Sequence, residues 1–158
     1  MTAVSYYLGI DPGVAAGMGF FTLAAPHLII AEDLPVVASE VYADALAERL
    51  RQMGPVAAMV ERVGPMPKQG VSSTFKFGAA YGAIRATIAA VGIPCHLVAP
   101  TVWKKAYRLS SDKEDARAEA IRRWPGAGCF VRKKDHNRAD AALLAHYAAT
   151  VLGGGGAP

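Results

Sequence analysis

Short apolar segments alternate with glycine- and proline-containing segments along the chain, and their order predicts an α/β fold. Residues 6–10 form a short apolar run that ends at Asp11-Pro12-Gly13, a pattern typical of a buried strand followed by a turn. Two more apolar runs, at 17–24 and 28–32, follow after turn-sized gaps. That spacing predicts three consecutive antiparallel strands.

A helix is predicted over about residues 41–53, because apolar positions recur on one side and charged positions on the other. Ser39 is its expected N-cap, and Gly54-Pro55 ends it. The apolar run at 56–60 then predicts a second buried strand, which ends in Glu61. A strand, a crossover helix and a strand in this order predict a parallel pair.

The remaining pattern predicts a helix over about 72–91, a strand at 93–98 and helices over about 111–124 and 137–152. The expected fold is therefore an α/β domain with a mixed five-stranded sheet, three antiparallel strands followed by two parallel ones, flanked by helices. We expect one domain over residues 1–152 and a flexible tail at 153–158. Small residues in the 72–91 helix permit close packing, on its own sheet or across a dimer axis: Gly78, Ala79, Gly82, Ala83 and Ala86.

Two of the predicted strands end in a carboxylate. If the strand before Glu61 lies beside the first strand, Asp11 and Glu61 come within a few ångströms of each other, since parallel strands end at the same edge. Two carboxylates that close repel unless a proton or a cation lies between them. A divalent metal is therefore the simplest inference, and a turn-forming Asp11 is the alternative.

A third carboxylate, Asp140, lies near the start of the last predicted helix, in the segment Asp135-His136-Asn137-Arg138-Ala139-Asp140. His136 and Asp140 are four residues apart and Asn137 and Asp140 three apart, so either pair can share a helix face. Three or four oxygen or nitrogen ligands would be enough to hold two Mg²⁺ ions for phosphodiester cleavage. The alternative is that Asp135 caps the helix and Asp140 is an ordinary surface residue.

Positive charge is concentrated in the last third of the chain. The net charge is +4, but residues 1–100 carry six of the 17 Lys and Arg and seven of the 13 Asp and Glu, a net of −1, which leaves +5 for the remainder. The segment 103–109 also interleaves aromatic and basic residues. This distribution favours a polyanionic partner, nucleic acid first, over a merely solvated basic surface.

Several classes of protein are disfavoured by the sequence. No apolar run is as long as a membrane span and the first residues carry no basic leader, so we expect a soluble, cytoplasmic protein with no membrane partner. Cys95 and Cys129 make no disulfide framework. A zinc site built from these cysteines with His96 and His136 would fit none of the standard ligand spacings.

The ordered motifs resemble the RNase H-like superfamily and, more closely, the RuvC-type Holliday junction resolvases, particularly their compact phage members. The first motif alone is weak, because sugar kinases and actin-like ATPases begin similarly, but the ordered set spans nearly the whole chain. The matching stretches are Gly9-Ile10-Asp11-Pro12-Gly13, Val60-Glu61, Phe75-Lys76-Phe77-Gly78 with Tyr81-Gly82, Pro100 with Trp103-Lys104-Lys105, Asp112-Lys113, and Ala139-Asp140-Ala141.

The resemblance implies a metal-dependent endonuclease that cuts four-way or branched DNA in a bacterial or phage-infected cell. Asp11, Glu61 and Asp140 would bind two Mg²⁺ ions, with Mn²⁺ as a substitute, for in-line hydrolysis to a 5′-phosphate and a 3′-hydroxyl. The family has a fourth ligand about one turn before the last Asp. His136 is the first choice for it, Asp135 the second, and Asn137, at the position bacterial members use, would be a poor Mg²⁺ ligand.

The resemblance also implies that basic residues position phosphates near the metals, and that the 72–91 helix forms a homodimer interface. The expected DNA-binding residues are Lys68, Lys76, Lys104, Lys105, Arg108, Lys113, Lys133 and Lys134. Two other functions keep the same fold: a nuclease acting on RNA or RNA–DNA hybrid, and a non-catalytic nucleic-acid-binding relative. Half of an actin-like ATPase is disfavoured, because the chain is too short for the two halves such enzymes need.

Overall fold

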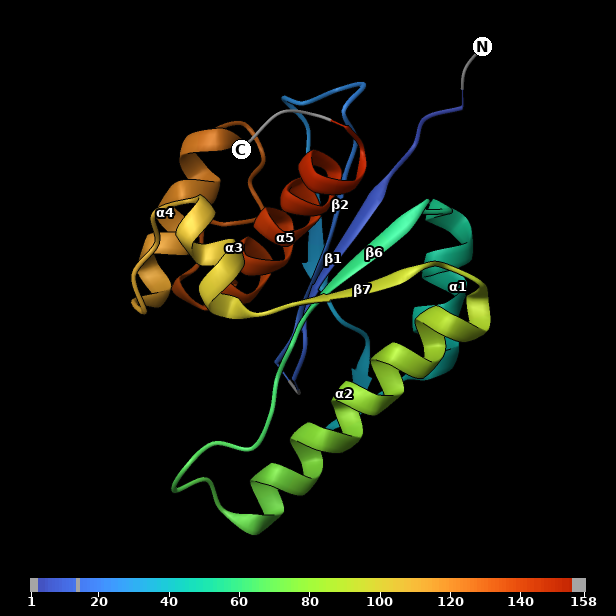
Figure 1. Cartoon of the computed structure of the whole chain (residues 1–158), viewed down its shortest axis with the longest axis vertical. Helices are drawn as coiled ribbons and strands as arrows, with labels where there is room; N and C mark the ends of the chain where they lie inside the picture. The colour runs from blue at the N-terminus through green and yellow to red at the C-terminus, as the bar shows by residue number, and fades with distance from the viewer. Residues whose placement is uncertain (1–2, 14, 155–158) are drawn as a thin grey trace.

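A mixed sheet of five strands is the centre of the fold in the computed structural model, which describes residues 3–13 and 15–154. The strand order is β3-β2-β1-β6-β7 (Figure 1). β1 pairs with β2 antiparallel, β2 with β3 antiparallel, and β6 and β7 continue the sheet in parallel. The predicted fold class is therefore confirmed. The strands are β1 (Tyr7–Asp11), β2 (Gly17–Phe21), β3 (Ile30–Asp33), β6 (Ala57–Glu61) and β7 (Cys95–Val98).

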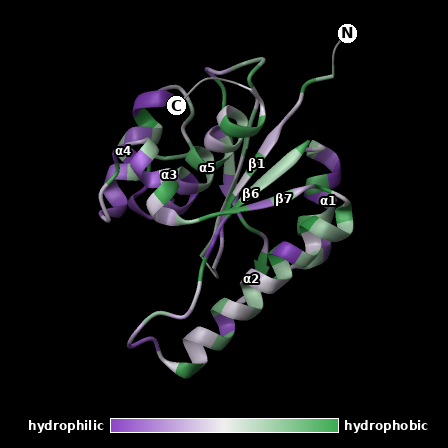
Figure 2. Ribbon diagram, in the orientation of Figure 1, coloured by the Kyte–Doolittle hydropathy of each residue, from purple (hydrophilic) through white to green (hydrophobic). Residues whose placement is uncertain are grey.

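Helices cover both faces of this sheet, and each face has its own hydrophobic core. On one side lie α1 (Ala43–Met53) and α2 (Val71–Val91). On the other lie α3 (Pro100–Ala106), α4 (Lys113–Arg123) and α5 (His136–Leu152), with the short 3-10 helix η1 (Lys133–Asp135) just before α5. Figure 2 shows that hydrophilic residues are dense on α4, whereas α2 and the strands are mostly apolar or neutral.

The start of α1 differs from its prediction. Ser39 does not cap the helix, because it lies with Ala38 in a turn where both residues have positive φ, 63° and 51°. This turn joins β4 (Val36–Val37) to β5 (Glu40–Val41), and α1 begins only at Ala43. Two-residue hairpin turns favour positive φ at both positions, so a local hairpin competes with the capping signal of a serine.

The last helix, α5, packs directly on the backbone of β1 and β2. Gly9 and Gly19 are cross-strand partners, and a Cβ atom on either would collide with the backbone of Ala141. A Cβ atom on Gly17 would likewise collide with the backbone of Asn137. The absence of side chains at these glycines allows the alanine-rich helix to approach the sheet, and this seats its first turns over the carboxyl end of β1.

The glycines of α2, Gly78 and Gly82, do not allow this helix to approach the sheet in the way that Gly9 and Gly19 do for α5. In the part of the chain that the structure describes, no atom lies within 4 Å of the Cβ position of Gly78 or Gly82, and both residues are exposed. The alternative that these glycines seat α2 on its own sheet is therefore wrong. Gly78, Gly82 and Ala86 are exposed on this helix, whereas Ala79 and Ala83 line the groove beside the β4–β5 hairpin.

The last predicted helix and the predicted tail lie at the end of the described residues. α5 ends at Leu152, and residues 155–158 of the predicted tail lie outside the described residues. Cys95 and Cys129 are free thiols. None of the helices in residues 3–13 and 15–154 is long and apolar enough to span a membrane.

Candidate active site

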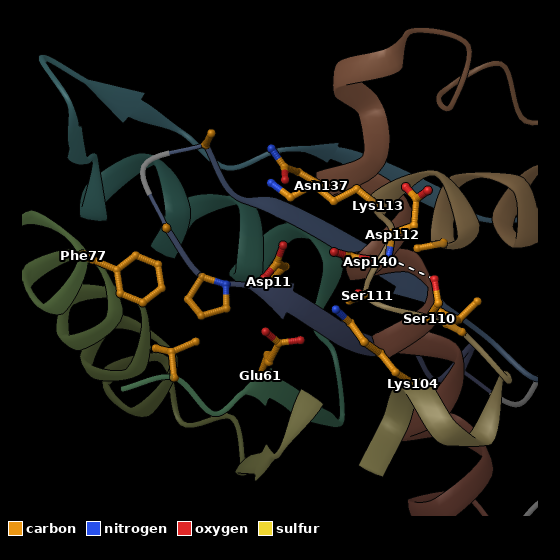
Figure 3. A pocket seen from close by; sticks show the side chains of 16 residues that line it. Asp11, Glu61, Phe77, Lys104, Ser110, Ser111, Asp112, Lys113, Asn137 and Asp140 are labelled. Atoms are coloured by element: carbon orange, nitrogen blue, oxygen red, sulfur yellow. Dashed lines mark hydrogen bonds between the residues drawn. The ribbon is translucent and has the colours of Figure 1, made fainter. Parts of the chain in front are cut away.

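Three carboxylates from three different elements line one cavity of about 370 Å³, which we call the carboxylate cavity. Ile10 pairs with Val60 in the parallel register of β1 and β6, so Asp11 and Glu61, the next residues, end the two strands side by side. Asp140 reaches the same cavity from the second turn of α5. In Figure 3 the carboxylates of Asp11 and Glu61 point toward each other, with the end of Lys104 beside them.

The environment of Asp11 and Asp140 disfavours their charge. Burial raises the pKa of Asp11 well above its ordinary value, and the neighbouring Asp140 and Glu61 raise it further. Burial also raises the pKa of Asp140 to about 7. Lys104 and Lys113 oppose both shifts through their positive charge. Without a cation, the metal-free site therefore favours a proton on Asp11 or Asp140 near neutral pH.

The residues present fit a hard divalent cation. Oδ1 of Asp140 is buried and has no hydrogen-bond partner among the described residues, so this acceptor is left for another group. Carboxylate oxygens are the donors that Mg²⁺ and Mn²⁺ prefer. In the described ranges, no three His, Cys, Asp or Glu side chains already converge at ligand distance from one point. Binding would therefore require the carboxylates to adjust.

Of the three candidates for a fourth ligand, only Asn137 lines the carboxylate cavity. His136 lines a separate hollow, and its Nδ1 atom is buried without a partner. Asp135 is only 2% exposed and is held by Arg132, whose backbone N–H and guanidinium Nη2 donate to it at 2.7 and 2.8 Å. The structure thus brings Asp11, Glu61 and Asp140 together with Asn137, and does not bring His136 or Asp135 to them.

Two basic hollows open beside the carboxylate cavity. The first, which we call the Lys105 hollow, is lined by Lys104, Lys105 and Arg108. The second, the Lys133 hollow, is lined by three lysines, two acidic residues, a serine and a histidine: Lys113, Lys133, Lys134, Asp112, Glu114, Ser111 and His136. Ser111 lines all three spaces, and each hollow shares a lysine with the carboxylate cavity.

The other two predicted DNA-binding residues lie away from this centre. Lys76 lines a groove between α2 and the β4–β5 hairpin. Lys68 is exposed in the loop before α2, at a positive φ of 65°. Six of the eight predicted basic residues therefore gather around the carboxylate cavity.

The interleaving of aromatic residues and lysines in segment 103–109 suggested a nucleic-acid-binding surface, but the aromatic residues do not lie on the surface. Trp103 and Tyr107 are buried in the core between α3, α4 and α5, at 0% and 7% exposure. Their four-residue spacing in a helix puts them on one face, with the lysines on another, and this periodicity was the signal that could have identified them as core. The sequence interpretation also missed Phe77, which forms a wall of the carboxylate cavity.

Known structures share this fold. Thermus thermophilus RuvC in complex with a Holliday junction substrate superposes with a TM-score of 0.68 over 98% of this chain and 99% of that one, at 21% identity. A second structure of Thermus thermophilus RuvC gives a TM-score of 0.64 at 19% identity, covering 93% and 96% of the two chains. The yeast mitochondrial Holliday junction resolvase Ydc2 gives 0.51 at 18% identity, covering 92% and 78%. Neither a family profile nor a curated protein sequence matches the chain.

Proposed function

We propose that this protein is a metal-dependent, structure-selective endonuclease that cuts four-way or otherwise branched DNA. The main observation in its support is that three carboxylates and two lysines line one cavity: Asp11, Glu61, Asp140, Lys104 and Lys113. This cavity lies at the carboxyl edge of a sheet whose fold is shared with RuvC, a protein solved in complex with a Holliday junction.

Two Mg²⁺ ions, or Mn²⁺ in their place, would be held by the three carboxylates and by the side-chain oxygen of Asn137. Bound there, they would activate water for in-line attack on a phosphodiester and stabilise the leaving oxygen, which yields a 5′-phosphate and a 3′-hydroxyl. The carboxamide makes the donor set less negative than four carboxylates would be. A bound cation would also offset the burial and the mutual repulsion that raise the pKa values of Asp11 and Asp140.

The lysines of the cavity act on the other charged partner, the phosphate. Lys104 and Lys113 line the same cavity as the carboxylates, so a phosphodiester that reaches the carboxylates also meets two ammonium groups. Their positive charge favours the approach of the phosphate and stabilises the added negative charge of the transition state. Lys105 and Arg108 in one hollow, and Lys133 and Lys134 beside Asp112 and Glu114 in the other, add further positive charges next to this cavity. They suit the phosphates that precede and follow the bond to be cut.

Two active sites are needed to resolve a four-way junction, because two strands of opposite arms must be cut. One site per chain therefore favours a homodimer with two-fold symmetry. α2 is the expected contact, since Gly78, Gly82 and Ala86 are exposed at four-residue spacing and nothing in the described chain packs on the two glycines. A partner helix could approach such a face closely.

The test is a comparison of substrates with Mg²⁺: a mobile four-way junction, a linear duplex and an RNA–DNA hybrid of the same sequence. We expect nicking of the junction well above the other two. Asp11→Asn should abolish cleavage and leave junction binding in Ca²⁺ nearly unchanged. Preferred cleavage of the hybrid would contradict the proposed substrate. A variant that keeps a tenth of the wild-type rate, a loss of only about 1.4 kcal/mol, would show that the site is misassigned.

A further inference from the structure

A buried indole contacts one of the three carboxylates. Nε1 of Trp103, in α3, donates a hydrogen bond of 2.8 Å to Oε2 of Glu61 at the end of β6. Trp103 is 0% exposed, whereas Glu61 is partly exposed and lines the carboxylate cavity. A hydrogen bond to a carboxylate is charge-assisted, which makes it stronger than a bond between neutral groups.

The indole is held rigidly from behind. Its ring packs edge-on against Tyr107, with centroids 6.4 Å apart, inside the core that also contains Met59, Val98 and Leu143. The hydroxyl of Tyr107 lies 3.2 Å from the backbone carbonyl oxygen of Leu143, to which it donates. The position of the N–H donor is thus set by packing between α3 and α5, and a mobile side chain such as Lys or Gln would not define it as well.

The same ring also supports a lysine of the cavity. Nζ of Lys104 lies 5.7 Å from the centroid of the Trp103 ring, within the range of a cation–π contact. One buried side chain therefore contacts both an acidic and a basic group of the carboxylate cavity.

We propose that Trp103 is a positioning residue for the metal site. By engaging Oε2, the indole orients the Glu61 carboxylate and leaves Oε1 as the oxygen that a divalent cation takes. This inference rests on the proposed function, because it assumes that Glu61 is a cation ligand. Groups that orient metal-binding side chains typically affect metal affinity or activity by about 10- to 100-fold when they are removed.

The alternative is a purely structural role, in which a buried N–H merely needs an acceptor. The second tryptophan gives the matched control. Trp124 is also buried, at 2% exposure, but its Nε1 donates at 3.2 Å to the backbone carbonyl of Pro26, away from the carboxylates. Trp103→Phe and Trp124→Phe each remove one buried indole donor, and only the first removes it from Glu61.

The experiment is a calorimetric titration of the full chain with Mn²⁺ in the absence of DNA. We expect Trp103→Phe to weaken Mn²⁺ binding by at least about tenfold, and Trp124→Phe to leave it within about twofold of wild type. Binding by Trp103→Phe within twofold of wild type would overturn the proposal. Equal weakening by both variants would also overturn it, because that pattern follows from general destabilisation.

A second measurement does not depend on the folding of Trp103→Phe. In the Trp124→Phe background, Trp103 supplies the only indole N–H signal in a ¹H–¹⁵N spectrum. Mg²⁺ should shift this signal, with saturation at the concentration that saturates cation binding, since the acceptor carboxylate becomes a ligand. A signal that does not move while Mg²⁺ binds would overturn the proposal.

These readouts separate the inference from the proposed function. A wild-type protein that binds Mn²⁺ through Trp103-positioned Glu61 but cuts no branched DNA would support the inference and contradict the proposed function. If the wild type resolves junctions but Trp103→Phe binds Mn²⁺ as tightly as the wild type does, the proposed function is supported and the inference about Trp103 is contradicted. Absence of any cation binding by the wild type would overturn both.

Discussion

Gly9 and Gly19 are cross-strand partners in β1 and β2, and both lie directly under the backbone of α5. A Cβ atom on Gly19 would stand 2.7 Å from the carbonyl oxygen of Ala141. Asp140 precedes that alanine in the chain, and Asp11 ends the strand that contains Gly9. The close contact between helix and sheet therefore also sets the spacing of two of the three carboxylates.

The first prediction concerns this contact. Gly19→Ala should lower the free energy of unfolding by about 1–3 kcal/mol, because the new methyl group meets backbone atoms that cannot rotate away. Gly126→Ala is the control, since its Cβ position has no atom within 4 Å. Urea denaturation monitored by circular dichroism measures both. Equal stability of the two variants would mean that α5 does not pack as tightly as described.

The second prediction concerns the charge of Asp140. Its pKa of about 7 lies above the ordinary value of 3.8, so its contribution to stability is complete below about pH 4 and is lost as the pH rises through 7. In EDTA, Asp140→Asn should therefore reduce the fall in unfolding free energy between pH 5 and 8 by about 1 kcal/mol or more. Asp44→Asn, at an exposed position of α1, should leave this fall unchanged.

The same variant reports on metal binding. Mg²⁺ at millimolar concentration should raise the melting temperature of the wild type at pH 8, because a bound cation stabilises the folded state by mass action and relieves repulsion among the carboxylates. Asp140→Asn should lose most of this increase. An increase of equal size in both proteins would place the bound Mg²⁺ elsewhere.

The third prediction distinguishes the candidates for the fourth ligand. Asn137→Asp adds a carboxylate to the carboxylate cavity and should strengthen Mg²⁺ binding, by roughly tenfold for about 1.4 kcal/mol of added attraction. His136→Gln, in the Lys133 hollow, should change the affinity by less than about twofold. Calorimetric titration checks both. A large loss of Mg²⁺ affinity in His136→Gln would restore His136 as a ligand.

The fourth prediction tests the two basic hollows. Replacing Lys105 and Arg108, or Lys133 and Lys134, by alanine should weaken junction binding and reduce the slope of log K against log salt by about 2 for each pair, since about 0.9 counterions are released per phosphate contact. Arg51→Ala, on α1 at the opposite face of the sheet, should leave the slope unchanged. An unaltered slope in either pair would mark that hollow as a solvated surface.

The fifth prediction concerns assembly. Gly82→Leu should convert a wild-type dimer into a folded monomer that nicks a junction without making the paired second cut, because the leucine fills the space that a partner helix would use. Ala118→Leu, at an exposed position of α4, should leave the dimer intact. Analytical ultracentrifugation measures the assembly. A wild-type protein that is monomeric both free and on a junction would exclude the dimer.

Local patterns in the sequence were enough to predict the five-stranded sheet and two residues of the site, Asp11 and Glu61. The apolar runs before Asp11 and Glu61 are local signals, and a parallel pair puts the ends of its strands at one edge wherever the helices pack. One local signal gave a wrong prediction: Ser39 was expected to cap a helix, but it lies in the turn of the β4–β5 hairpin.

Which side chains of the later helices reach the site depends on how those helices pack against the sheet. His136 and Asn137 are adjacent, and neighbouring residues on a helix point about 100° apart, so the rotation of α5 about its axis decides which of them faces the site. Contact with Gly9, Gly17 and Gly19 sets that rotation and directs Asn137 to the carboxylate cavity. Trp103 likewise could not be assigned to Glu61 from the sequence. The two residues are 42 positions apart, and only the packing of α3 against the core brings them together.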